Sequence, residues 1–163
     1  MFGFGKKKVT VELQAPFAGQ AATMADVPDP AFSGKMLGDG FAVAPRSTDA
    51  TLLVCAPAAG TLQMVFKTGH AFSVKTTEGL DVLVHIGLDT VELKGEGFTV
   101  LTQQGEQVTA GQPIIEVDLA RLKQKGKNLI TPVVLSEKSQ VAEVHAITGA
   151  VSQGDTVATV TMA

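Results

Sequence analysis

Two histidines close together in the chain carry the strongest chemical signal in this sequence. His85 stands among apolar, strand-forming residues in the run V-H-I-G-L-D-T-V-E-L-K-G-E-G-F (84–98), and His70 lies one short hairpin before it. Taken alone, a histidine in an apolar strand is usually a core residue. Two imidazoles together suit two chemistries above all, accepting a phosphoryl group on nitrogen and binding a transition metal.

The segments around these histidines predict a β-hairpin. Strands over 72–75 and 80–85 would flank the turn T-T-E-G (76–79), whose composition favours a chain reversal. With this four-residue loop, His70 lies directly opposite His85, and both side chains emerge on one face with their Cβ atoms about 5 Å apart. A slip of one residue in the loop would separate them.

Length and composition predict one ordinary globular domain. The chain has 163 residues, 45% of them hydrophobic and 18% charged, with 17 Gly and 7 Pro, a profile typical of short strands and many turns. The formal net charge of −3 gives no overall field that would attract nucleic acid. The single cysteine, Cys55, excludes an intramolecular disulfide and fits a protein of a reducing compartment. Its apolar neighbours predict that it is a small buried residue.

Residues 1–8 are predicted to form a flexible tail ahead of a domain that spans 9–163. The tail ends in the basic run K-K-K (6–8) but has no apolar region of a signal peptide, and the chain has no stretch of about 20 apolar residues. We therefore expect a soluble, cytoplasmic protein with at most peripheral membrane contact.

Two internal echoes indicate a duplicated β unit. A-P-F-A-G (15–19) matches A-P-A-A-G (56–60), and 108–117 matches 151–160 as V-x-x-G-[QD]-x-[IV]-x-x-V. Each copy reads as a turn that leads into a strand, because glycine supplies the turn geometry and apolar residues follow it. We expect the copies to pair as related halves of a sandwich or barrel.

Short strands dominate the rest of the chain. One helix is expected over 119–125, with Asp118 as its N-cap and Gly126 as its stop signal, and 24–32 reads as a loop. The predicted fold class is all-β, a single-domain β-sandwich or barrel of duplicated hairpins with at most one or two short helical turns. Beyond the hairpin and the echoes, strands are predicted over 9–13, 41–44, 61–66, 91–93, 99–101, 131–135 and 141–145.

Four motifs occur in an order and spacing that resemble one protein family. They are G-D-G (38–40), F-K-T-G-H-A-F (66–72), the run 84–98 and T-P-V-V (131–134). The sequence is similar to the glucose-type IIA phosphocarrier domain of the bacterial sugar phosphotransferase system, from about Val9 to the C-terminus. The resemblance implies a β-sandwich in which Nε2 of His85 accepts a phosphoryl group from the phosphocarrier HPr. A cysteine of a IIB domain would then take it for sugar uptake and phosphorylation.

The resemblance also implies roles for the neighbours of His85. His70 would hydrogen-bond the phosphoryl oxygens, and Thr68 would hold the histidine pair in orientation. The carbonyl of Gly87 would accept from the other nitrogen of His85, and Asp89 would lie at the rim. Elementary chemistry agrees, because a neutral imidazole is a nucleophile at pH 7 and positioned donors stabilise a transferring phosphoryl group without a metal. No cofactor is therefore required.

Docking of a partner protein requires apolar surface around the histidines. On the predicted register, Phe72 and Leu83 share the histidine face and are the first candidates. Each candidate could instead be an ordinary core residue. The further candidates are Phe66, Met36, Phe41, Ile86 and Val91.

Three functions from other classes stay open. A zinc-dependent hydrolase could use His70, His85 and Asp89, although the chain lacks the H-x-H pair of zinc endopeptidases of related architecture. A biotinyl or lipoyl carrier needs a lysine at a tight turn, for which Lys94 is a candidate without the usual flanking residues. A structural or regulatory binding module is the third.

Two further expectations follow from the resemblance. His70 and His85 could bind Zn²⁺ at a partner interface if the partner supplies a carboxylate. Regulated enzymes or permeases would be additional partners, because other proteins read the phosphorylation state of free-standing members of the family. The sugar is not specified by this chain, since a IIA domain does not contact it.

Overall fold

The computed structural model describes residues 8–46 and 49–163. The predicted tail and its basic run fall almost entirely on residues 1–7, outside this range. Within the described residues the chain forms fourteen strands and two short α-helices, so the predicted all-β class is confirmed. The strands are β1 (Thr10–Gln14), β2 (Gly19–Thr23), β3 (Asp39–Pro45), β4 (Thr51–Cys55), β5 (Gly60–Val65), β6 (Ala71–Thr76), β7 (Asp81–His85), β8 (Phe98–Val100), β9 (Gln107–Val108), β10 (Pro113–Asp118), β11 (Thr131–Leu135), β12 (Val141–Ala146), β13 (Gly149–Val151) and β14 (Thr156–Met162). The helices are α1 (Pro30–Ser33) and α2 (Leu119–Gln124), with 3₁₀ turns η1 (Met24–Asp26), η2 (Thr90–Leu93) and η3 (Lys138–Gln140).

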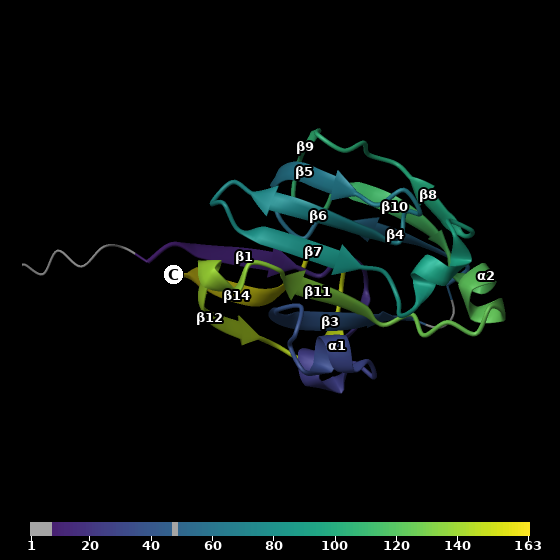
Figure 1. The fold of residues 1–163 in the computed structure, drawn as a ribbon, viewed down its shortest axis with the longest axis horizontal. Helices are drawn as coiled ribbons and strands as arrows, with labels where there is room; N and C mark the ends of the chain where they lie inside the picture. Colours follow the sequence, from purple (N-terminus) through teal and green to yellow (C-terminus); the bar gives the residue numbers. More distant parts are fainter. Residues whose placement is uncertain (1–7, 47–48) are drawn as a thin grey trace, which may run out of the picture.

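Antiparallel strands form one large and two small sheets (Figure 1). The large sheet has eight strands in the order β13-β2-β3-β11-β7-β6-β5-β9, and the small sheets are β1-β14-β12 and β4-β10-β8. One hydrophobic core contains side chains from all three sheets, including the fully buried Phe41, Phe72 and Ile115. Burying each of these side chains contributes roughly 1.5–3 kcal/mol of favourable transfer free energy, and their shared core holds the layers together.

The two copies of the first sequence echo contact each other in the fold. The N–H of Gln14 donates to the carbonyl of Pro57 at 2.8 Å, and the N–H of Cys55 donates to the carbonyl of Pro16 at 2.9 Å. Each bond is the counterpart of the other in the duplicated segment. The predicted pairing of related copies is therefore present in this echo.

The second echo behaves differently, because its copies do not pair with each other. β10 is the central strand of one small sheet and β14 is the central strand of the other. Each copy bonds instead to the first echo, since Ala15 N–H donates to Asp155 O at 2.8 Å and Ala56 N–H donates to Gln112 O at 2.9 Å. The two copies thus occupy equivalent places in two separate sheets.

The secondary structure differs from the prediction in two segments, 91–93 and 24–32. The predicted strand 91–93 is the 3₁₀ turn η2, bounded by Asp89 and Lys94 in the left-handed region with φ of 57° and 53°. Three residues are too few for periodicity to separate a strand from a turn. The predicted loop 24–32 contains η1 and the start of α1, where the Asp29 side chain accepts from Ala31 N–H at 3.0 Å and Pro30 occupies the first turn.

The predicted helix is confirmed as α2. Its N-cap Asp118 accepts from Arg121 N–H at 3.0 Å, and Gly126 follows the helix with φ of 73°. The prediction succeeded because both signals are local to the chain. None of the helices in the described ranges has the length and apolar character needed to cross a bilayer.

Candidate functional site

The hairpin β6–β7 has a register one residue away from the predicted one. Ala71 pairs with His85, and Thr76 N–H donates to Leu80 O at 2.9 Å, so the loop has three residues rather than four. Gly79 lies in this loop with φ of 94°, a backbone conformation that three-residue hairpin loops require and glycine supplies. The predicted four-residue loop, and with it the direct His70–His85 pairing, is therefore wrong.

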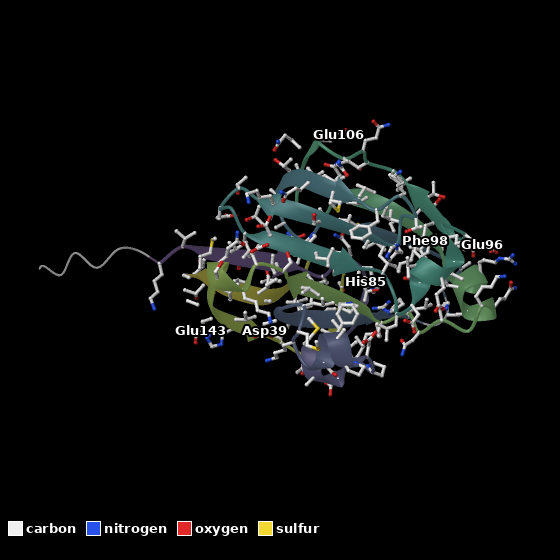
Figure 2. All side chains as sticks on the ribbon, in the orientation of Figure 1. Asp39, His85, Glu96, Phe98, Glu106 and Glu143 are labelled. Carbon is white, nitrogen blue, oxygen red and sulfur yellow. The ribbon has the colours of Figure 1, made fainter. Side chains whose placement is uncertain are left out.

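The two imidazoles nevertheless lie against each other, with ring centroids 5.2 Å apart and planes at 80°. His70 precedes the first residue of β6, and Gly69 with φ of 72° turns the chain there, so strand alternation does not govern the His70 side chain. The His70 carbonyl accepts from Ile86 N–H at 2.7 Å and ties this turn to the end of β7. Figure 2 shows the His85 side chain at that end of β7.

Hydrogen bonding fixes the proton of His85. Its Nδ1 lies 2.7 Å from the carbonyl oxygen of Gly87, which can only accept, so Nδ1 carries the proton. The neutral ring then keeps its lone pair on Nε2. Burial lowers the pKa of this half-buried ring, while the Gly87 carbonyl and the carboxylates of Asp29 and Asp89 act in the opposite direction.

His70 is more deeply buried, with 4% of its surface exposed. Its Nδ1 contacts the hydroxyl of Thr68, and its ring packs edge-on against Phe66 with centroids 5.2 Å apart. Burial and the neighbouring His85 lower its pKa, so at pH 7 both rings are mainly neutral.

Sequence reasoning missed two residues on the other side of His85. The ring centroid of Phe32 lies 5.2 Å from that of His85, and the Asp29 carboxylate, which caps the same helix α1, raises the pKa of His85 more than Asp89 does. The pair Asp29-Pro30 is a helix-start signal and could have indicated α1. Its placement next to His85 could not be read from sequence, because four strands, β3 to β6, separate α1 from β7 in the chain.

The candidate docking residues divide into two groups. Phe72, Phe41 and Ile86 are at most 2% exposed and belong to the core, so their assignment to a partner surface is wrong. The register explains Phe72, since its side chain points to the core with that of Val84, its pairing partner. The remaining candidates are Leu83, partly buried on the His85 face, and the exposed Phe66, Met36 and Val91.

The alternative zinc-hydrolase set does not come together. Within residues 8–46 and 49–163, no three or more His, Cys, Asp or Glu side chains are grouped closely enough to hold a metal ion. Asp89 instead occupies the residue before η2 and is exposed. His70 and His85 therefore offer two ligands of the three that a catalytic zinc takes from its protein.

Ion pairs connect the segment that follows His85 with α2 and the residues after it. Glu96 extends toward α2 (Figure 2) and pairs with Arg121 and, at 3.8 Å, with Lys125. Glu92 of η2 pairs with Lys127, whose side chain is only 15% exposed. Such partly exposed pairs contribute little stability individually, but these join η2 and the turn after it to α2 and the residues that follow α2.

Comparisons with known proteins show which family the chain resembles. The family model described as phosphoenolpyruvate-dependent sugar phosphotransferase system, EIIA 1, matches residues 11–141. The glucose-specific EIIA component of Haemophilus influenzae is 42% identical over 151 residues, covering 93% of this chain and 89% of that protein. The one from Staphylococcus aureus is 39% identical over 146 residues, covering 89% and 86%.

The solved structure of glucose permease IIA from Mycoplasma capricolum shares the fold. It superposes with a TM-score of 0.84 at 37% sequence identity and covers 98% of this chain and 99% of that one. The sequence match and the structural match thus both span nearly the whole chain. The protein belongs to the EIIA 1 family of the phosphoenolpyruvate-dependent sugar phosphotransferase system and is a phosphotransfer component of that system.

Proposed function

We propose that Nε2 of His85 accepts a phosphoryl group from the phosphohistidine of HPr and passes it to a cysteine of a IIB domain. The observation that carries this proposal is the 2.7 Å contact between Nδ1 of His85 and the Gly87 carbonyl. It holds the proton on Nδ1 and leaves Nε2 with the lone pair that attacks phosphorus.

Both transfers balance without a cofactor. In the first, the Nε2 lone pair of His85 forms a bond to phosphorus while the donor P–N bond breaks and its electron pair returns to the donor histidine. In the second, a cysteine thiolate attacks the phosphorus and the electron pair of the P–N bond returns to Nε2. The proton on Nδ1 stays in place throughout, so catalysis is mainly positioning and charge stabilisation.

His70 is the proposed donor to the phosphoryl oxygens. When the Thr68 hydroxyl donates to Nδ1 of His70, the neutral ring keeps its own proton on Nε2. That N–H can donate to a phosphoryl oxygen on His85, whose ring is 5.2 Å away centroid to centroid. A buried donor of this kind stabilises the developing charge more than a solvent-exposed one.

Exposed apolar side chains next to the histidines form the proposed docking rim, defined as Met36, Leu37, Phe66 and Val91. Phe66 packs on His70, and Met36 and Leu37 follow the helix that places Phe32 on His85. Because the relatives are named as glucose-specific components, the IIB domain of a glucose permease is the first acceptor to test.

Intact-mass analysis after incubation with phosphoenolpyruvate, enzyme I and HPr tests the proposal. We expect one added, acid-labile phosphoryl group, and none on His85→Ala. His145→Ala is the matched control, because His145 lies exposed on β12. The control should be phosphorylated like the unmodified protein, and a fully phosphorylated His85→Ala variant would show that another residue is the acceptor.

The role of His70 and the absence of a cofactor are tested in the same assay. His70→Gln should accept the group from HPr and pass it to the IIB cysteine more slowly. Purified phospho-HPr should phosphorylate His85 equally well with and without a strong chelator. A loss of transfer with the chelator would instead implicate a metal such as Zn²⁺ at the partner interface, held by His70 and His85.

A further inference from the structure

Two buried threonines hold the peptide group between Ile86 and Gly87, directly after the proposed phosphoryl acceptor. Thr90 and Thr131 are both 0% exposed. The Thr90 hydroxyl donates to the carbonyl of Ile86 at 2.6 Å, and the Thr131 hydroxyl accepts from the N–H of Gly87 at 3.4 Å. Both polar groups of this one peptide are therefore bound to threonine side chains.

The directions of these bonds follow from their partners. The Ile86 carbonyl can only accept, so Thr90 must donate its proton there. Thr131 donates its own proton to Leu129 O at 3.1 Å, so its lone pairs are left for the Gly87 N–H. Neither hydroxyl is free to rotate without losing a hydrogen bond and leaving a buried polar group unpaired.

The next peptide group, between Gly87 and Leu88, is held as well. Its carbonyl accepts from Nδ1 of His85, and its N–H donates to Asn128 O at 2.9 Å. The methyl group of Thr90 also packs against Gly87, since a Cβ added there would lie 2.8 Å from Thr90 Cγ2. These contacts together hold the Gly87 carbonyl in the direction of Nδ1 of His85.

We propose that Thr90 and Thr131 are positioning residues for phosphoryl transfer. By fixing the Ile86–Gly87 peptide they aim the Gly87 carbonyl at Nδ1 of His85, which keeps the proton on Nδ1 and the lone pair on Nε2. This inference rests on the proposed function of His85. It gives a task to Thr131, the first residue of the T-P-V-V motif, which the transfer chemistry itself does not use.

Thr90→Val and Thr131→Val test the inference, because each removes a hydroxyl and keeps the shape of the side chain. The first readout is the ¹⁵N NMR spectrum of the unphosphorylated protein, which shows which ring nitrogen of His85 carries the proton. We expect part of the Nδ1–H tautomer to convert to Nε2–H. The second readout is the transfer rate from phospho-HPr, expected to fall by up to about 100-fold, as for a reacting group misplaced by about 1 Å.

The controls separate positioning from general damage. Thr102→Val removes a comparable buried hydroxyl that donates to Pro113 O at 2.9 Å beside the sheet β4-β10-β8, and the His85 tautomer should not change. Thr90→Ser keeps the hydroxyl and should keep the Nδ1–H tautomer. If Thr90→Val does not fold, Thr90→Ala removes the same hydroxyl without putting a methyl group in its place.

The outcomes are distinct. Wild-type tautomer and wild-type rate in both valine variants would overturn the inference, as would an equal change in Thr102→Val. A wild-type protein that accepts no phosphoryl group would overturn the proposed function, while the tautomer comparison would still decide whether the threonines orient His85.

Discussion

His85 and His70 lie in surroundings that favour their neutral forms. Burial is the main cause for both rings, and each pKa lies below the usual histidine value of about 6.5. A neutral acceptor and a neutral donor suit a site that must receive a doubly charged phosphoryl group without first losing a proton. The pKa shifts also make the stability of the protein depend on pH.

Stability should increase with pH over the range in which the two histidines titrate. Between the native pKa and the value of about 6.5 in the unfolded chain, the unfolded state binds more protons, so the free energy of unfolding rises with pH there. We expect the full stability above about pH 6.5 and a decline as the pH falls below it. Urea unfolding across this range measures the decline, and His70→Gln should flatten it. Identical pH profiles of the two proteins would contradict this expectation.

Gly87 has a conformation and surroundings that exclude a side chain. Its φ is 73°, and an added Cβ would lie 2.8 Å from Thr90 Cγ2 and 3.0 Å from Asn128 O. We expect Gly87→Ala to lower the free energy of unfolding by more than the roughly 1–3 kcal/mol of backbone strain alone. Gly79→Ala is the matched control, with φ of 94° and no atom within 4 Å of the added Cβ. Equal losses in denaturant unfolding would show that the contacts at Gly87 relax freely.

At the scale of elements, three short segments meet at His85. The hairpin β6–β7 ends in His85 and begins directly after His70, η2 follows the Gly87 turn, and α1 places Phe32 against the imidazole. Only the hairpin is continuous with both histidines in sequence. The contribution of α1 depends on its own stability, which its N-cap Asp29 supports.

Asp29 has two separable effects on this site. Its side chain caps α1, and its negative charge raises the pKa of His85 against the larger effect of burial. Asp29→Ala should cost about 1 kcal/mol of stability as a lost cap and should lower the His85 pKa further. Asp29→Asn should keep most of the cap and still lower the pKa. NMR titration of His85 measures the second effect, and an unchanged titration in both variants would show that Asp29 does not influence the imidazole.

At the scale of the whole molecule, the two related halves share one core. The bonds from Gln14 to Pro57 and from Cys55 to Pro16 join the two copies of the first echo, and the pairing of β11 with β7 makes the large sheet continuous. Buried side chains from all three sheets pack in the same core cluster. We therefore expect the domain to unfold as one cooperative unit.

Cys55 reports on that cooperativity because it is the only cysteine in the chain and is buried in the joining region. Burial raises the pKa of its thiol, which keeps it protonated and unreactive in the folded state. Thiol labelling in increasing urea should follow the same transition as far-UV circular dichroism. Labelling at urea concentrations below that transition would instead reveal local opening around β4.

Much of this protein was predictable because its signals are local. Turn residues and short apolar runs indicated an all-β fold, Asp118 and Gly126 bounded α2, and the spacing of the motifs around His70 and His85 identified the family. Caps, turns and motif spacing depend on a few consecutive residues, so they can be read without knowing what packs against them.

The tertiary structure decided what depends on contacts between distant segments. The hairpin loop has three residues rather than four, and since side chains alternate along a strand, that one residue turned Phe72 into the core. Phe32 of α1 contacts His85 only because the folded chain brings these distant segments together. Thr131 joins Thr90 at the Ile86–Gly87 peptide because β11 pairs with β7. The sequence by itself thus determined which residues carry the chemistry, whereas packing between segments far apart in the chain decided which side chains surround and orient them.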